Sequence, residues 1–186
     1  MKKTSVRNYL IEEGLQLKSG EILISPNIAY ETWGNLNKDF SNAVLVTTGL
    51  SPSSHIASNE LNIEQGWWEN IIGPNKAIDT NRFFVICANS LGSCFGSTGP
   101  SSKNPQTNQP YQLLFPRLSI EDIASSLISL IKHLGINQLQ TIVGPSMGGM
   151  TALSIVQQAP EITKEMILIS TSASSRPLSS PTRAAV

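Results

Sequence analysis

A serine flanked by glycines is the feature of this sequence with the clearest chemistry. The segment 144–148 reads GPSMG, which has the G-x-S-x-G spacing, and it follows an apolar run at 141–143 and precedes a helical pattern. In such a strand-to-helix turn the hydroxyl of the serine, here Ser146, is lifted clear of the sheet and can act as a nucleophile. The glycines are needed because the tight turn brings backbones too close for a Cβ atom. The spacing alone arises by chance in many chains, so the flanking elements carry the interpretation.

A nucleophilic serine also needs hydrogen-bond donors for the oxyanion that forms during acyl transfer. One donor is expected to be the backbone N–H of Met147, the residue after the nucleophile, and the second is expected in the loop after an earlier strand. That loop is 49–54, directly after the apolar run 43–48, and Leu50 is the candidate second donor. The positive end of the helix that follows Ser146 would stabilise the same charge.

The general base is the part that the sequence does not supply. In this arrangement an acidic residue and then a histidine follow the serine, but after Ser146 there is no histidine and no aspartate, only Glu161 and Glu165. His133 falls in the last turn of a predicted helix, where a surface position explains it. His55 lies beside the predicted oxyanion loop, and a structural hydrogen-bonding role explains it better than a role as base. The Asp and His of a triad are therefore absent from this chain.

The elements that would position these residues follow an α/β pattern. Four apolar, β-branched runs predict buried strands of a parallel sheet, at 43–48, 83–88, 140–143 and 166–170. Alternation predicts a further strand at 28–33, and 21–24 is the best short strand before it. Helices are expected over 119–134, where Ser119 and Asp122 make a capping-box-like start, and from about 148 to 158. Strands that alternate with helices predict a mostly parallel sheet flanked by helices.

The segment 91–118 differs from these elements because it is rich in Gly, Ser, Pro, Asn and Gln and has no period. Structureless connections of this length are usually functional or disordered. Apolar residues occur within it at Phe95, Tyr111, Leu113, Leu114 and Phe115, and they favour an ordered loop.

Composition limits the possible classes of protein. The chain has 186 residues, 40% hydrophobic and 14% charged, with thirteen charges of each sign, which fits one globular domain. A net charge of zero gives no electrostatic case for binding nucleic acid or an anionic membrane. Cys87 and Cys94 have neither a metal-ligand spacing nor a disulfide framework, so free thiols in a reducing compartment are expected. No signal peptide and no apolar run of membrane-spanning length is visible, which predicts a cytoplasmic protein.

Several stretches of the chain resemble the homoserine O-acetyltransferase family, which are acyltransferases with the α/β-hydrolase fold. They are AYETWG at 29–34, GWW at 66–68, IGP at 72–74, KAIDT at 76–80, RFFVIC at 82–87, GSTGP at 96–100, FP at 115–116 and SMGGM at 146–150. They run in the family's order across almost the whole chain and are far more specific together than the serine turn alone.

The resemblance implies an enzyme of methionine or cysteine biosynthesis with an acyl-Ser146 intermediate. It would move an acetyl or succinyl group from acetyl-CoA or succinyl-CoA to the hydroxyl of L-homoserine or L-serine, with no bound cofactor and no metal. Its partners would be these small molecules, and full-length relatives would be homodimers. The strings TGLSPSSH at 48–55 and NSLGSCF at 89–95 resemble the branch that acylates serine or uses succinyl-CoA, which leaves the acyl donor and the acceptor open.

Full-length members of this family continue with a lid, further strands and loops that carry the aspartate and the histidine. Residues 1–186 are therefore expected to form the N-terminal part of a single α/β-hydrolase domain, with the lid and the last strands absent. Little or no turnover is expected, because loss of a triad member costs several orders of magnitude in rate. The apolar strand at 166–170 would become an unpaired edge and impair folding. The alternatives are an esterase or thioesterase of the same fold, and a non-catalytic remnant or one half of a split enzyme.

Overall fold

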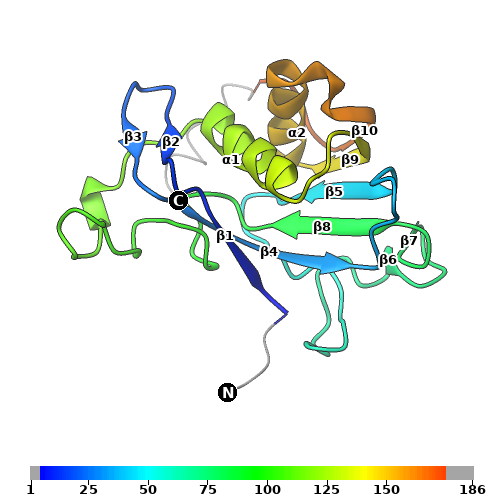
Figure 1. Cartoon of the computed structure of the whole chain (residues 1–186). Coiled ribbons are helices and arrows are strands. Elements are labelled where there is room, and N and C mark those ends of the chain that lie inside the picture. The colour runs from blue at the N-terminus through cyan, green and yellow to red at the C-terminus, as the bar shows by residue number, and fades with distance from the viewer. Residues whose placement is uncertain (1–4, 175–186) are drawn as a thin grey trace.

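A six-stranded sheet forms the centre of the molecule in the computed structural model, which describes residues 5–174 (Figure 1). The strands are β1 (Arg7–Leu10), β2 (Leu15–Gln16), β3 (Ile22–Leu23), β4 (Asn27–Trp33), β5 (Ala43–Thr47), β6 (Ile72–Gly73), β7 (Ile78–Asp79), β8 (Phe84–Ala88), β9 (Leu139–Pro145) and β10 (Thr163–Ile169). The helices are η1 (Gln112–Leu114), α1 (Ile120–His133), α2 (Met147–Gln158) and η2 (Pro160–Ile162). The lysine-containing start at 1–4 and the Ser/Pro-rich end after 174 lie outside the described residues.

The order of the strands in the large sheet is β1-β4-β8-β5-β9-β10. β5, β8, β9 and β10 run parallel to one another, whereas β4 is antiparallel to β8 and β1 is antiparallel to β4. β5 and β8 lie in the middle and are almost wholly buried, as their continuous apolar runs predict. The predicted α/β-hydrolase class, a mostly parallel sheet flanked by helices, is confirmed.

The two faces of the sheet pack against different parts of the chain because side chains alternate along each strand. On one face Leu45, Ile86 and Ile142 contact the helical layer of α1 and α2. On the other face the strand residues pack against the irregular segment 56–78. The central strands are therefore packed on both faces of the sheet, which holds the loops at their ends in place.

α1 begins and ends where its sequence predicts. The Ser119 hydroxyl accepts a hydrogen bond from the Asp122 N–H (3.2 Å), and the Asp122 carboxylate accepts one from the Ser119 N–H (2.7 Å), so the capping box is complete. Gly135, with φ 74°, follows the last turn. The predicted strands and helices agree with the observed ones within a few residues at each end.

The loop between β8 and α1 is anchored to the main core by two aromatic residues, Tyr111 and Phe115. Tyr111 is buried and meets Phe115 edge to face at 5.3 Å between ring centroids. Leu113 and Leu114 of η1, which buries none of its residues, are exposed instead, and so is Phe95 earlier in the loop. Only part of the apolar set in this segment therefore anchors it.

β10 forms one edge of the described sheet and pairs only with β9 there. Ile167, Leu168 and Ile169 are each more than a third exposed on it. The expected apolar edge is therefore present within residues 5–174. No described helix is long and apolar enough to cross a membrane.

Candidate active site

Ser146 occupies the turn between β9 and α2. Its φ of 54° and ψ of −125° lie outside the regions that residues with a Cβ normally adopt. The turn is held by hydrogen bonds from the Ser146 N–H to the Ile169 carbonyl (2.9 Å) and from the Gly149 N–H to the Ser146 carbonyl (3.0 Å). The residue is exposed, and within residues 5–174 its hydroxyl has no hydrogen-bond partner. Strain of this kind concentrates at functional sites.

The two glycines of the motif are required by close backbone contacts. A Cβ atom built on Gly144 would lie 2.7 Å from the Gly149 Cα, and one on Gly148 would lie 2.6 Å from the Thr47 carbonyl oxygen. Both distances are shorter than a Cβ atom tolerates, so α2 can begin this close to β5 and β9 only with glycine at these positions. The side chain of Thr47 adds a hydrogen bond to the Gly148 carbonyl (2.8 Å).

The loop that is predicted to supply the second oxyanion donor lies next to the nucleophile elbow, which is the turn formed by residues 144–148. A Cβ atom built on Gly49 would lie 3.9 Å from the Ser146 Cβ. Leu50 and Met147 line the same cavity of about 320 Å³. Met147 is the first residue of α2, where backbone N–H groups have no partner within the helix, and the Leu50 N–H has no acceptor among residues 5–174. Both N–H groups are therefore available to a ligand, and their role as oxyanion donors stays a prediction.

This cavity is mainly apolar and opens at the carboxyl ends of the central strands. Besides Leu50 and Met147 it is lined by the 90–93 segment after β8, by Phe115, Pro116 and Leu118 before α1, and by Ile123 of α1. No charged side chain lines it. A small acyl group or the uncharged arm of a larger acyl donor fits this lining.

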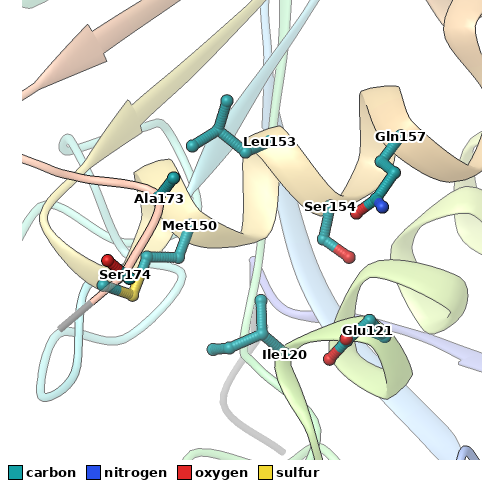
Figure 2. A pocket seen from close by; sticks show the side chains of 8 residues that line it. All are labelled: Ile120, Glu121, Met150, Leu153, Ser154, Gln157, Ala173 and Ser174. Carbon is teal, nitrogen blue, oxygen red and sulfur yellow. The ribbon is translucent and has the colours of Figure 1, made fainter.

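A larger cavity of about 540 Å³ lies between the first turn of α1 and the outer side of α2 (Figure 2). Figure 2 shows Met150 and Leu153 of α2 on one side, Ile120 of α1 on the other, and Ala173 beside Met150. It is lined by neither Ser146 nor a histidine. Ser146 and the histidines do not line the smaller cavity either, but Met147, the residue after Ser146, and Leu50 do, so the smaller cavity is the better candidate for the site.

Neither histidine is available to Ser146 as a base. The His55 ring contacts the Glu31 carboxylate through Nδ1 (3.1 Å) and the Glu64 carbonyl through Nε2 (2.8 Å), so both nitrogens are occupied. His133 is exposed and stacks on Tyr9 at 4.1 Å between ring centroids. It lies at the end of α1, before β9, whereas Ser146 follows β9, a strand roughly 20 Å long.

The two glutamates that follow the elbow in sequence are also far from Ser146. Glu165 pairs in register with Thr141 near the start of β9, and Glu161 lies in η2 before β10. Both precede the carboxyl ends of the strands, where Ser146 lies. Among residues 5–174 no group of three or more His, Cys, Asp or Glu side chains is placed to hold a metal ion.

Glu31 is the residue that sequence reasoning missed. Glu31 lies in the AYETWG string at 29–34, for which the sequence predicts no chemical role. In the structure its carboxylate is almost completely buried in β4 and has three polar contacts. The available signal was an acidic residue inside an otherwise apolar, alternating strand. Asn89, at the end of β8, was missed as well, although it bridges the loops at 54 and 95.

Comparison with known proteins gives the family. The sequence pattern of the family described as "alpha/beta hydrolase fold" matches residues 42–185. The chain is 53% identical over 173 residues to a serine O-succinyltransferase of Stenotrophomonas maltophilia (strain K279a). These residues cover 93% of this chain and 47% of that protein.

Two solved structures are also similar. A homoserine O-acetyltransferase from Bacillus anthracis superposes with a TM-score of 0.88 at 34% identity, covering 97% of this chain and 50% of that chain. The crystal structure of esterase E22 superposes with a TM-score of 0.84 at 34% identity, covering 93% and 49%. The chain thus spans about half the length of the proteins it matches.

Proposed function

Since the chain belongs to the alpha/beta hydrolase fold family, we propose that Ser146 is the nucleophile of an O-acyltransferase and that residues 1–186 form the first part of its single catalytic domain. The observation that carries this proposal is the strained, exposed Ser146 beside the 49–54 loop. The similarity to a serine O-succinyltransferase and to a homoserine O-acetyltransferase supports acyl transfer to a hydroxyl.

The proposed reaction has two steps. Ser146 Oγ attacks the carbonyl carbon of an acyl-CoA thioester while its proton passes to a general base, and the C–S bond breaks to release the thiol, which takes a proton. The hydroxyl of the amino-acid acceptor then attacks the acyl-Ser146 ester, and Ser146 recovers its proton. In both steps the Met147 and Leu50 N–H groups hold the oxyanion, and the positive end of α2 supports it.

The acyl group and the acceptor are proposed from the relatives. Serine and a succinyl group come first, since relatives that are 51–53% identical to the chain are serine O-succinyltransferases. Homoserine and an acetyl group come second, from the structural relative. The O-acyl amino acid formed is an activated ester, which suits the cysteine or methionine biosynthesis that the resemblance implies. A cytoplasmic location and a homodimeric full-length relative stay predictions.

The general base is proposed to come from outside this sequence. Both histidines of the chain are engaged elsewhere, and the relatives are about twice as long as the chain. Without a base the serine hydroxyl is a weak nucleophile. We therefore expect the chain on its own to turn over far more slowly than a full-length relative.

An esterase is the second candidate, because esterase E22 is as similar in sequence as the acetyltransferase structure. The two functions differ in the group that accepts the acyl group, water or an amino-acid hydroxyl. The test incubates the chain with succinyl-CoA or acetyl-CoA, with and without L-serine or L-homoserine, and measures thiol release and the O-acyl product. Intact mass and peptide mapping locate the acyl group.

The proposal expects an acyl group on Ser146, its loss on addition of an acceptor, and neither event in Ser146→Ala. Thiol release that is independent of any amino acid, with free carboxylic acid as product, would favour the esterase. Turnover should rise when the remaining part of the Stenotrophomonas maltophilia relative is added as a separate polypeptide. Labelling that persists in Ser146→Ala would refute the assigned nucleophile.

A further inference from the structure

A buried pair of Glu31 and His55 lies at the end of the loop that carries Leu50. Glu31 is on the face of β4 that packs against segment 56–78, and its side chain is 1% exposed. Its Oε2 lies 3.1 Å from His55 Nδ1 and also accepts a hydrogen bond from the Asn59 amide (3.3 Å). An ionised carboxylate so deeply buried requires partners of this kind.

The contacts of the His55 ring identify its charge. Nε2 lies 2.8 Å from the Glu64 carbonyl, which can only accept, so Nε2 carries a proton. Nδ1 faces the nearer Glu31 carboxylate, and the Asn62 amide nitrogen lies farther away at 3.5 Å. A ring with acceptors on both sides is satisfied as the imidazolium. The pair is therefore an ion pair between a buried carboxylate and a partly buried imidazolium.

Ser54, the residue before His55, connects the pair to the loop through a long contact with Glu31, and a short hydrogen bond to Asn89 holds Ser54 itself. The Ser54 N–H donates to Asn89 Oδ1 (2.5 Å), and the Ser54 hydroxyl reaches Glu31 Oε1 at 3.5 Å. The indole N–H of Trp67 donates to the Ser53 carbonyl (2.9 Å).

At the start of the loop, the Thr47 hydroxyl is fixed to the elbow through the Gly148 carbonyl, and Thr48 contacts the Ser90 hydroxyl at 3.0 Å. Residues 49–53 thus form a short span with one end tied to the nucleophile elbow and the other end tied to the Glu31–His55 pair.

We propose that Glu31 and His55 are positioning residues that fix the backbone of residues 49–53, so that the Leu50 N–H points to the reacting carbonyl at Ser146. This inference rests on the proposed function for the meaning of the Leu50 N–H, but its physical content is a coupling between His55 and the loop. The pair acts through Ser54, which precedes His55 in the chain and contacts Glu31, and it is not proposed to touch the substrate.

The coupling gives the loop a pH dependence with a definite sign. Burial of His55 opposes its charged form, but the hydrogen bonds to the Glu64 carbonyl and to Glu31, with the charges of both carboxylates, outweigh it and raise the pKa of His55 above 6.5. Cys87, opposite Glu31 in β8, stays neutral because burial and then the Glu31 charge raise its pKa.

Stabilisation from a group whose pKa is raised on folding is fully present below the unfolded value and is lost as the pH rises through the folded value. The proposal therefore expects the pair to contribute its full stabilisation of the loop below 6.5 and to lose that contribution as the pH rises through the pKa of folded His55.

NMR spectroscopy can test this on the chain as it is, because it contains only two histidines, His55 and His133. The two rings are assigned with His133→Gln, which is also the control because His133 lies on the surface of α1. His55 is expected to titrate above 6.5, and the amide resonances of Gly49 and Leu50 are expected to shift with the same midpoint. Glu31→Gln keeps the shape and removes the charge, so it should lower the His55 midpoint and move the Leu50 amide at low pH.

The inference is overturned if His55 titrates at or below 6.5, or if the Leu50 amide ignores the titration of His55. The wild-type titration decides this even if Glu31→Gln fails to fold. Failure of the proposed function is a separate result, seen as no acyl group on Ser146. Coupling between His55 and Leu50 in a chain that is never acylated would uphold the positioning of the loop and refute only its catalytic purpose.

Discussion

Replacing Ser146 with glycine is expected to stabilise the chain while removing the proposed nucleophile. The φ of 54° and ψ of −125° at Ser146 are strained for a residue with a Cβ, and such strain amounts to about 1–3 kcal/mol. Glycine adopts this conformation freely but adds freedom to the unfolded chain, which offsets about 0.5–1 kcal/mol. The net expectation is a rise of roughly 0.5–2 kcal/mol in the free energy of unfolding.

Ser146→Ala is the matched control, because it keeps the Cβ atom and with it the strain. The exposed hydroxyl that it removes has no partner among residues 5–174, so its effect should stay within about ±0.5 kcal/mol. Urea unfolding followed by circular dichroism measures both variants, and equal slopes allow the midpoints to be compared. In a thermal scan the gain corresponds to roughly 1–8 °C. A glycine variant no more stable than the alanine variant would refute the strain at the elbow.

Three further changes test the elements around the site. Ser119→Ala removes the capping hydroxyl of α1 and should lower the free energy of unfolding by about 0.5–2 kcal/mol in the same urea assay. Gly148→Ala places a Cβ 2.6 Å from the Thr47 carbonyl oxygen, so it should lower the free energy of unfolding by about 1–3 kcal/mol. It should also slow the reaction of Ser146 with a phosphonate that mimics the tetrahedral intermediate. The pKa of Glu69 is lowered from 4.5 to about 2, chiefly by the hydrogen bond from the Ser58 N–H. Its stabilisation is present above 4.5 and lost as the pH falls towards about 2, so Glu69→Gln should lose less stability than wild type over that window.

The sequence predicts the central strands and the elbow well because their signals are local. β5, β8 and β9 are continuous apolar runs, and the Ser119 capping box marks the start of α1. The antiparallel pairing of β4 is not encoded in such a pattern, because alternation looks the same in either direction. β3 lies within the strand predicted at 21–24, whereas β2, β6 and β7 have two residues each and are too short for a period to show.

The candidate site divides in the same way. Ser146, Met147 and Leu50 could be proposed from the G-x-S-x-G spacing together with the predicted strands, since each lies shortly after the end of one. Glu31 could not, because its partner His55 is 24 residues away and meets it only after β4 pairs with β8. The burial of the Glu31 charge depends on the assembled sheet and on the segment that packs against it, and a local sequence pattern reports on neither.

Under the proposed function, the described residues supply the binding geometry of an acyl-transfer site but no group that accepts the proton of Ser146. The strained elbow, the glycine contacts and the 49–54 loop are all fixed by the core of this chain. In serine proteases that lack a triad member, binding and the oxyanion donors alone retain about 10³–10⁴-fold acceleration over water. Ser146 should therefore react slowly with a phosphonate that mimics the tetrahedral intermediate, and the adduct should shift the Leu50 amide. Ser146→Ala should not react, and an adduct that leaves the Leu50 amide unmoved would show that the second oxyanion donor lies elsewhere.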